Sequence, residues 1–206
     1  MVCYVNDMKV SHKNKEEVTK FIGYRKGIHG EEMPATRGKR HTYLGIDLDY
    51  GTPGEVIVLM DSYITEAIDE FPKEMMKSIK TPAGNHLFKV DDAYKKLYDR
   101  DKIIFHRLVA NLLFLSKRAR PDIHPKIAFL TTRVINPDED DWKKLRRVFR
   151  YLDATINTVK LHLNAYDLNV FHCWMESSYS THTDLKVNTG ATISIGKGCV
   201  TSALKK

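Results

Sequence analysis

The tetrapeptide Tyr4-Val5-Asn6-Asp7 is the first part of the chain whose residue types and spacing could support chemistry. It lies where two short β-prone segments, residues 1–5 and 8–11, meet, and Asn-Asp is typical of a tight hairpin turn. A carboxylate held in such a turn can contact a metal ion that is bound to substrate phosphates. The residues alone leave an ordinary hairpin turn as the alternative.

Basic side chains are the second group with functional potential. The 206-residue chain has a net charge of +7, and residues 101–160 hold 13 Lys and Arg against seven Asp and Glu. Local positive charge attracts polyanions, nucleic acid most commonly, because each neutralised phosphate releases condensed counterions. A merely solvated helix surface is the alternative. We expect eight bases to contact nucleic acid: Lys117, Arg118, Arg120, Lys143, Lys144, Arg146, Arg147 and Arg150.

Other residue patterns argue against several classes of site. The nine histidines show no HxxxH or HExxH spacing and the three cysteines form no CxxC pair, so neither a zinc site nor a disulfide framework is indicated. The glycines of residues 23–38 match no phosphate-binding loop. Charges interrupt every apolar run, and residues 1–20 lack a signal-peptide core, so we expect an intracellular protein with no membrane partner.

The elements that must position these groups are mixed. With 42% hydrophobic and 29% charged residues, the chain is long enough to bury a core. Periodicity and turn residues predict, in order, a helix at 16–24, a loop at 27–40, strands at 42–50 and 55–60 around a turn at 51–54, a helix at 61–71 and a loop at 73–92.

The second half of the chain is predicted to contain helices at 101–119, 125–134 and 137–152, followed by strands at 158–163, 169–175, 189–195 and 199–202. In the last helix, Asn136 is expected to be the N-cap and Pro137 the first residue. Its stripe of Trp142, Leu145 and Leu152 should pack against the leucines at 108, 112 and 115. The same helical phase would turn its five bases mostly outward: Lys143, Lys144, Arg146, Arg147 and Arg150.

Taken together, eight segments resemble the pol polyprotein of copia-type retrotransposons in both order and spacing. The resemblance covers essentially the whole chain. Its segments are residues 4–11, 43–48, 81–83, 105–114, 120–123, 140–152, 189–191 and 200–202.

This resemblance implies an α+β fold with three parts. Residues 1–60 would be the end of a reverse-transcriptase palm, with its hairpins, and residues 61–155 a helical thumb and connection. Residues 156–206 would be the opening strands of a ribonuclease H domain. The family segment would thus be truncated at both ends, with the missing Pol segments available only in trans. Its partner would be a primer-template duplex of RNA-DNA or DNA.

The resemblance also assigns roles to individual residues. Asp7 and Asn6 stand at the catalytic hairpin, where the family pattern is Tyr-Val-Asp-Asp, so Asn6 is a departure from it. Glu176 stands where the family has the first metal-binding Asp of ribonuclease H. The primer-supporting hairpin would contain Tyr43, Leu44 and Gly45.

The family binds Mg²⁺, but the residues present here are expected to hold none tightly. Asn6 contributes no negative charge, which leaves Asp7 as the only carboxylate of an incomplete metal site. Glu176 moves its carboxylate out by one methylene, which octahedral Mg²⁺ tolerates poorly. Three hypotheses stay open: a catalytically inactive polymerase and ribonuclease H fragment, a non-enzymatic nucleic-acid-binding module, and a functionless, pseudogene-like relic.

Overall fold

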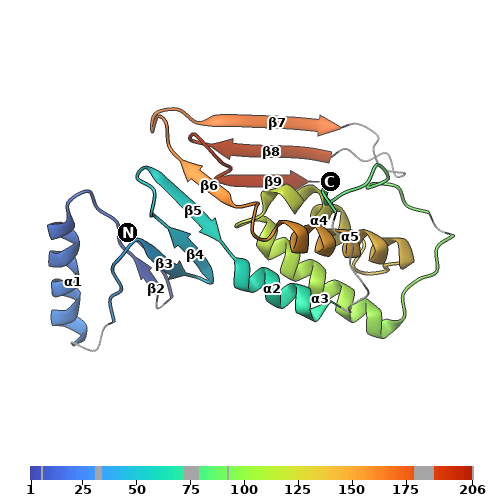
Figure 1. Ribbon diagram of the computed structural model, residues 1–206, viewed down its shortest axis with the longest axis horizontal. Helices are drawn as coiled ribbons and strands as arrows, with labels where there is room; N and C mark the ends of the chain where they lie inside the picture. Colours follow the sequence, from blue (N-terminus) through green and yellow to red (C-terminus); the bar gives the residue numbers. More distant parts are fainter. Residues whose placement is uncertain (6, 31–33, 72–78, 92, 179–187, 206) are drawn as a thin grey trace.

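The computed structural model describes residues 1–5, 7–30, 34–71, 79–91, 93–178 and 188–205. Within these ranges five α-helices, one 3-10 helix and nine strands form a mixed α and β fold, in agreement with the predicted α+β class. The strands make three separate antiparallel sheets of two, four and three strands. The helices α2 to α5 pack together at one end of the molecule, and α1 lies at the other (Figure 1).

The N-terminal hairpin agrees with the sequence prediction. Strand β1 (Val2–Tyr4) pairs with β2 (Asp7–Lys9), and Tyr4 lies opposite Asp7. Asn6 lies outside the described residues. Helix α1 (Lys15–His29) begins where the Asn14 side chain accepts a hydrogen bond from the backbone N–H of Glu16 at 2.9 Å. The helix continues beyond its predicted end because it passes through Gly27 and stops only at Gly30, whose φ is +85°.

The four-stranded sheet corrects one predicted element. Residues 42–50 are not one strand, because β3 (Arg40–Tyr43) and β4 (Ile46–Asp49) form a hairpin around Leu44 and Gly45. Both turn residues have positive φ, at 53° and 72°, as two-residue hairpin turns with the twist of a sheet require. The next hairpin, between β4 and β5 (Glu55–Leu59), is confirmed.

Strand β6 (Leu161–Asn164) completes this sheet by pairing with β5, although about a hundred residues separate the two strands. The pairing places His162 Nδ1 2.9 Å from the carboxylate of Glu55, which also accepts a hydrogen bond from Lys197 at 2.8 Å. A Cβ on Gly198, whose φ is +83°, would lie 2.0 Å from the His162 carbonyl oxygen. Glycine therefore permits the close approach of residue 198 to β6.

The helical part is compact, as predicted. It comprises α2 (Asp61–Glu70), α3 (Asp99–Ser116), the 3-10 helix η1 (Pro121–Ile123), α4 (His124–Thr131) and α5 (Glu139–Thr155). Leu145 and Leu152 of α5 share one buried core with the three predicted leucines of α3. The Trp142 ring stacks on Phe71 with centroids 5.5 Å apart, whereas Lys143 is exposed, so the predicted phase of α5 is confirmed.

The first turn of α5 differs from the prediction, since Asp138 is its N-cap instead of Asn136. The Asp138 side chain accepts from the backbone N–H of Asp141 at 3.0 Å, and the Asp141 side chain accepts from that of Asp138 at 3.1 Å. Arg133 donates to both carboxylates, at 3.0 and 2.9 Å. Lys96 adds an ion pair to Asp138 at 3.3 Å. Pro137 lies before this N-cap and outside the helix. Its carbonyl accepts a hydrogen bond from the backbone N–H of Leu97.

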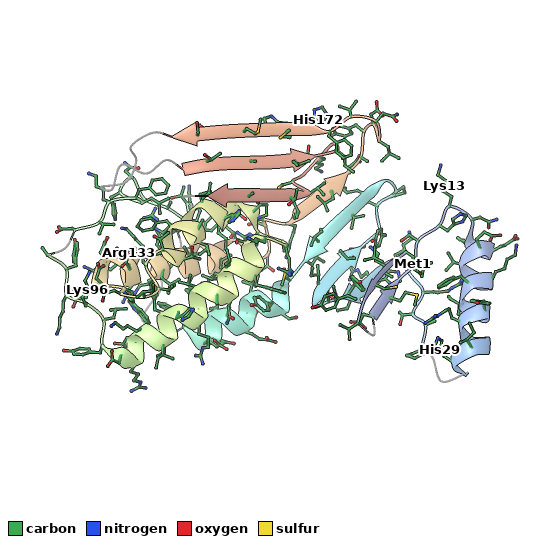
Figure 2. The ribbon with its side chains drawn as sticks, turned by 180° about the vertical axis from the view of Figure 1, so that it is seen from behind. Met1, Lys13, His29, Lys96, Arg133 and His172 are labelled. Carbon is green, nitrogen blue, oxygen red and sulfur yellow. The ribbon has the colours of Figure 1, made fainter. Side chains whose placement is uncertain are left out.

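The third sheet contains β7 (His172–Ser178), β8 (Asn188–Ser194) and β9 (Thr201–Lys205). This sheet lies over α4 (Figure 1). The two contact each other where Nδ1 of His124 in α4 lies 3.0 Å from the hydroxyl of Ser202 in β9. Lys96 and Arg133 lie together at the end of the molecule opposite α1 (Figure 2). The three cysteines are free. Within the described part of the chain, no helix is long and apolar enough to span a membrane.

Replacing Asp138 by Ala should lower the free energy of unfolding by about 2–4 kcal/mol, because the change removes an N-cap and leaves the Arg133 guanidinium with one carboxylate fewer. Urea unfolding followed by circular dichroism measures this. Asp99→Ala is the matched control, since the Asp99 side chain is 99% exposed, and should change stability by no more than about 0.5 kcal/mol. Equal effects of the two substitutions would contradict the assigned role of the cap.

Candidate functional site

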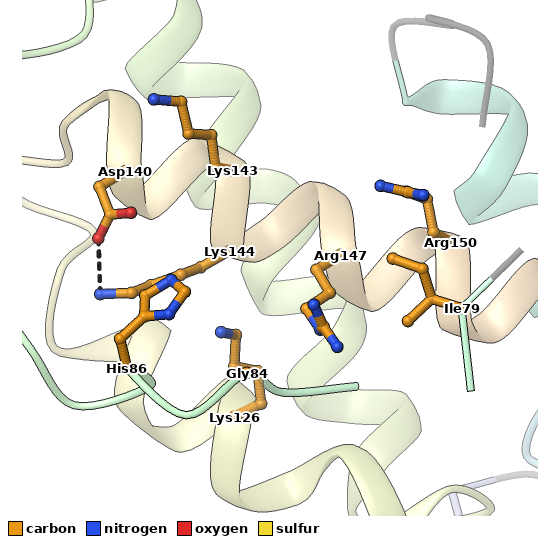
Figure 3. Close-up of a pocket in the computed structure, with 9 residues that line it drawn as sticks. All are labelled: Ile79, Gly84, His86, Lys126, Asp140, Lys143, Lys144, Arg147 and Arg150. Atoms are coloured by element: carbon orange, nitrogen blue, oxygen red, sulfur yellow. Dashed lines mark ion pairs between the residues drawn. The ribbon is translucent and has the colours of Figure 1, made fainter. Parts of the chain in front are cut away.

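A basic pocket of about 270 Å³ lies between α4, α5 and the segment of residues 79–91. Five of the described side chains that line it are bases and one is an acid. Lys126 and Arg147 extend into the same space from two helices, and His86 lies beside Lys144, whereas Lys143 points away from them (Figure 3). The described residues of the lining are Ile79, Gly84, His86, Lys126, Asp140, Lys143, Lys144, Arg147 and Arg150.

Lys126 is the most unusual residue of the pocket. Its side chain comes from α4 and is only 2% exposed. Within the described part of the chain, its ammonium makes no hydrogen bond or ion pair. Burial and, to a smaller extent, the positive charges of Lys144 and Arg147 lower the pKa of Lys126 to about 8, against the opposing effect of Asp140 and Asp141. A buried charge with so little compensation costs free energy.

The neighbouring Lys144 is also buried, at 3% exposed, but it is well compensated. Its ammonium donates to the Lys89 carbonyl at 2.6 Å and forms an ion pair with Asp140 at 2.8 Å. It also lies over the Phe129 ring, 4.8 Å from the centroid. Asp140, the one acid in the described lining, is therefore engaged with Lys144, which leaves Lys126 to face the pocket.

Arg147 is held in place by the segment of residues 79–91. Its Nε donates to the Thr81 carbonyl at 3.2 Å and one terminal nitrogen donates to the Thr81 hydroxyl at 2.9 Å. The other terminal nitrogen faces Gly84, where an added Cβ would lie 3.8 Å from it and 3.4 Å from the His86 ring. The bare backbone at Gly84 thus leaves room beside this guanidinium.

The structure brings four of the eight predicted bases to the pocket: Lys143, Lys144, Arg147 and Arg150. One detail of the prediction is wrong, because Lys144 does not turn outward. It lies one residue before Leu145, where the ion pair with Asp140 and the Lys89 carbonyl draw it inward. Arg146 is half-buried and lies outside the described lining.

Arg120 is also misassigned as a surface base, since it is 2% exposed. It donates to both oxygens of Asp122, at 3.0 and 2.8 Å, and to the Thr155 hydroxyl at 2.8 Å. These contacts tie η1 to the end of α5. Lys117 and Arg118 are exposed as expected, but neither is among the described residues of the pocket lining.

Sequence reasoning missed Lys126, which is central to the pocket. It is the only base in α4, and its neighbours Ile127, Phe129 and Leu130 are all buried. The sequence does offer one signal for it: α4 is an apolar helix with a single Lys and no acid. Such a lysine is unusual, because lysine is rarely buried unless it is paired.

The structure does not assemble a Mg²⁺ site around Asp7. Asp7 is exposed at the start of β2, and the described residues contain no cluster of three or more His, Cys, Asp or Glu that could hold a metal ion. Asp47 accepts from Thr42 at 2.6 Å, and Asp49 pairs with Arg40 at 2.8 Å. An octahedral divalent cation needs several converging oxygens, and the carboxylates of Asp47 and Asp49 are engaged with Thr42 and Arg40.

The remaining predicted site residues occupy β elements. Glu176 is exposed on β7, opposite Gly190 of β8. Tyr43 ends β3 and is half-buried, and Leu44 and Gly45 are exposed in the turn that follows. None of these four residues is among the described residues that line the basic pocket.

Replacing Lys126 by Met should stabilise the protein at pH 7 by roughly 1–3 kcal/mol. The folded-state pKa of about 8 lies below the usual 10.5, so folding releases a proton between these values. The cost of burying the charge is therefore full below pH 8 and disappears as the pH rises toward 10.5. Urea unfolding of both proteins from pH 7 to 10 measures the difference, which should shrink with rising pH. A difference independent of pH would contradict the assignment.

Two known proteins are similar to this chain. One, from Saccharomyces cerevisiae, is named for transposon Ty5-1 and is 25% identical over 98% of this chain and 64% of its own length. The other is the retrovirus-related Pol polyprotein from transposon TNT 1-94 of Nicotiana tabacum, 22% identical over 75% of this chain. The matched region spans 12% of that polyprotein. No protein-family model and no solved structure matches the chain. The chain is thus similar, at 22–25% identity, to a transposon protein and to part of a retrovirus-related Pol polyprotein.

Proposed function

We propose that this chain is a retrotransposon Pol segment that binds a nucleic-acid duplex through the basic face of α5, and that it is not itself an active polymerase or ribonuclease H. In this proposal the residues before α2 correspond to the end of a reverse-transcriptase palm. Residues 61–155 correspond to its thumb and connection, and residues 156–206 to the start of ribonuclease H. The observation that carries the binding function is the presence of five bases from α4 and α5 along one pocket and the adjoining face of α5.

The arrangement of α5 supports this proposal physically. Three residues of its apolar stripe, Leu145, Val148 and Leu152, are completely buried in the helical core. The face beyond that core holds Lys143, Arg147 and Arg150, which are exposed or half-buried. Because the core fixes the helix and the bases do not, the basic face can meet a polyanion without any change of fold. Contacts of this kind recognise phosphates and not base sequence.

The transposon names of the two relatives support a Pol origin but say nothing about binding by this chain. An unselected relic is the rival hypothesis. It predicts binding no stronger than that of any protein with the same net charge, wherever the bases lie. The hypotheses are therefore separated by comparing two variants that have the same net charge but carry their substitutions on different surfaces.

Changing Lys143, Arg147 and Arg150 together to Glu should weaken duplex binding roughly tenfold or more near physiological salt, equally for unrelated sequences. The slope of log affinity against log salt should become shallower by about 0.9 for each phosphate contact that is lost. Fluorescence anisotropy of a labelled DNA duplex at several salt concentrations measures both quantities.

The matched control changes Lys13, Lys15 and Lys20 to Glu. These exposed bases lie in or next to α1, and the control alters the net charge by the same amount. It should bind duplex nearly as well as the parent. If both triple variants lose affinity equally, binding follows net charge alone, and the proposed face is wrong.

The purified chain should not extend a primer when supplied with Mg²⁺, template and nucleotides. One carboxylate at the hairpin, Asp7, cannot hold the two metal ions that stabilise the entering and leaving oxygens of a phosphoryl transfer. Asn6→Asp alone should not restore extension. Extension that Asp7→Ala abolishes would show that another acid completes the site and that the inactive part of the proposal is incorrect.

A further inference from the structure

We infer that the pocket around Lys126 is a binding site for one phosphomonoester group, such as the 5′-phosphate end of a nucleic acid. The inference deepens the proposed function and rests on it for the source of the ligand. The same dianionic group is also present in free inorganic phosphate, so the test below separates the two sources.

The first support is the imbalance of charge inside the pocket. Five bases line the described part of the cavity, and the single acid, Asp140, is already paired with Lys144 at 2.8 Å. A compact anion with two charges would compensate Lys126 and Arg147 at once. Charge-assisted hydrogen bonds from Lys and Arg to phosphate are among the stronger polar contacts in proteins.

The second support is the state of Lys126. Its side chain is 2% exposed, points into the pocket, and has no polar partner among the described residues (Figure 3). An unpaired buried ammonium destabilises the fold, and it can be retained at little net cost if a ligand supplies the missing negative charge. Arg147, fixed by Thr81, offers a second donor that is already positioned.

The depth of Lys126 selects among phosphates. A backbone phosphodiester carries a sugar on each side and one charge, so it can reach the exposed bases of α5 but not a side chain that is almost wholly covered. A terminal phosphate carries one substituent and up to two charges, and it can enter the pocket end first. Backbone contacts on the α5 face and a chain end at Lys126 are thus compatible in one complex.

The experiment compares the full chain with Lys126→Met in two assays. The first measures the shift of the melting temperature with inorganic phosphate. The second measures the affinity for two DNA duplexes of identical sequence, one with a 5′-phosphate and one with a 5′-hydroxyl. Lys13→Met is the control, because Lys13 is an exposed lysine next to α1 and outside the described lining, and the charge lost is the same.

If the ligand is a nucleic-acid end, the parent and Lys13→Met should prefer the 5′-phosphorylated duplex about tenfold. Lys126→Met should lose that preference while it keeps its affinity for the 5′-hydroxyl duplex. If instead inorganic phosphate stabilises the parent and Lys13→Met but not Lys126→Met, and the two duplexes bind equally, the phosphate pocket stands with free phosphate as its ligand.

The inference is overturned if neither assay shows an effect that depends on Lys126. In that case, duplex binding with a steep salt dependence would leave the proposed function intact. Conversely, a Lys126-dependent phosphate effect without any duplex binding would retain the pocket and refute the proposed function.

Discussion

The interaction on which the rest of the helical part depends is the ion-paired cap at the start of α5. Asp138 and Asp141 close a reciprocal capping box, and Arg133 donates to both carboxylates at about 3 Å. Both acids are 2% exposed, so their charges must be compensated inside the protein. This network fixes the residue at which α5 begins. Together with the buried side chains of Leu145 and Leu152, it holds α5 in one position, with Lys144 and Arg147 toward the pocket.

A second consequence concerns the balance between stability and binding. The cap is a buried cluster of paired charges, whereas Lys126 on α4 is a buried charge with no partner among the described residues. The contrast is informative because both lie in the same helical unit. Buried charges that serve only the fold are paired, as Lys144 is with Asp140. An uncompensated one is the pattern expected of a group whose partner arrives from outside.

Much of the fold could be predicted from local sequence. The apolar stripe of α5 and the turn residues at 51–54 carry signals of short range, and the corresponding elements were confirmed. The exact N-cap was not predicted, because Asp138 is selected over Asn136 by contacts with Arg133 and Lys96. The pairing of β6 with β5 joins strands about a hundred residues apart, which periodicity does not encode. The burial of Lys126 and Lys144 could not be predicted for the same reason, since it depends on neighbouring helices.

The most direct test of the central claim, that a duplex lies on the basic face of α5, is amine labelling of the lysines with and without duplex, read by mass spectrometry. The account predicts that duplex protects Lys143 severalfold, while the exposed Lys13 and Lys15 next to α1 react as before. Protection of Lys13 and Lys15 with Lys143 unchanged would place the duplex on another surface and contradict the account.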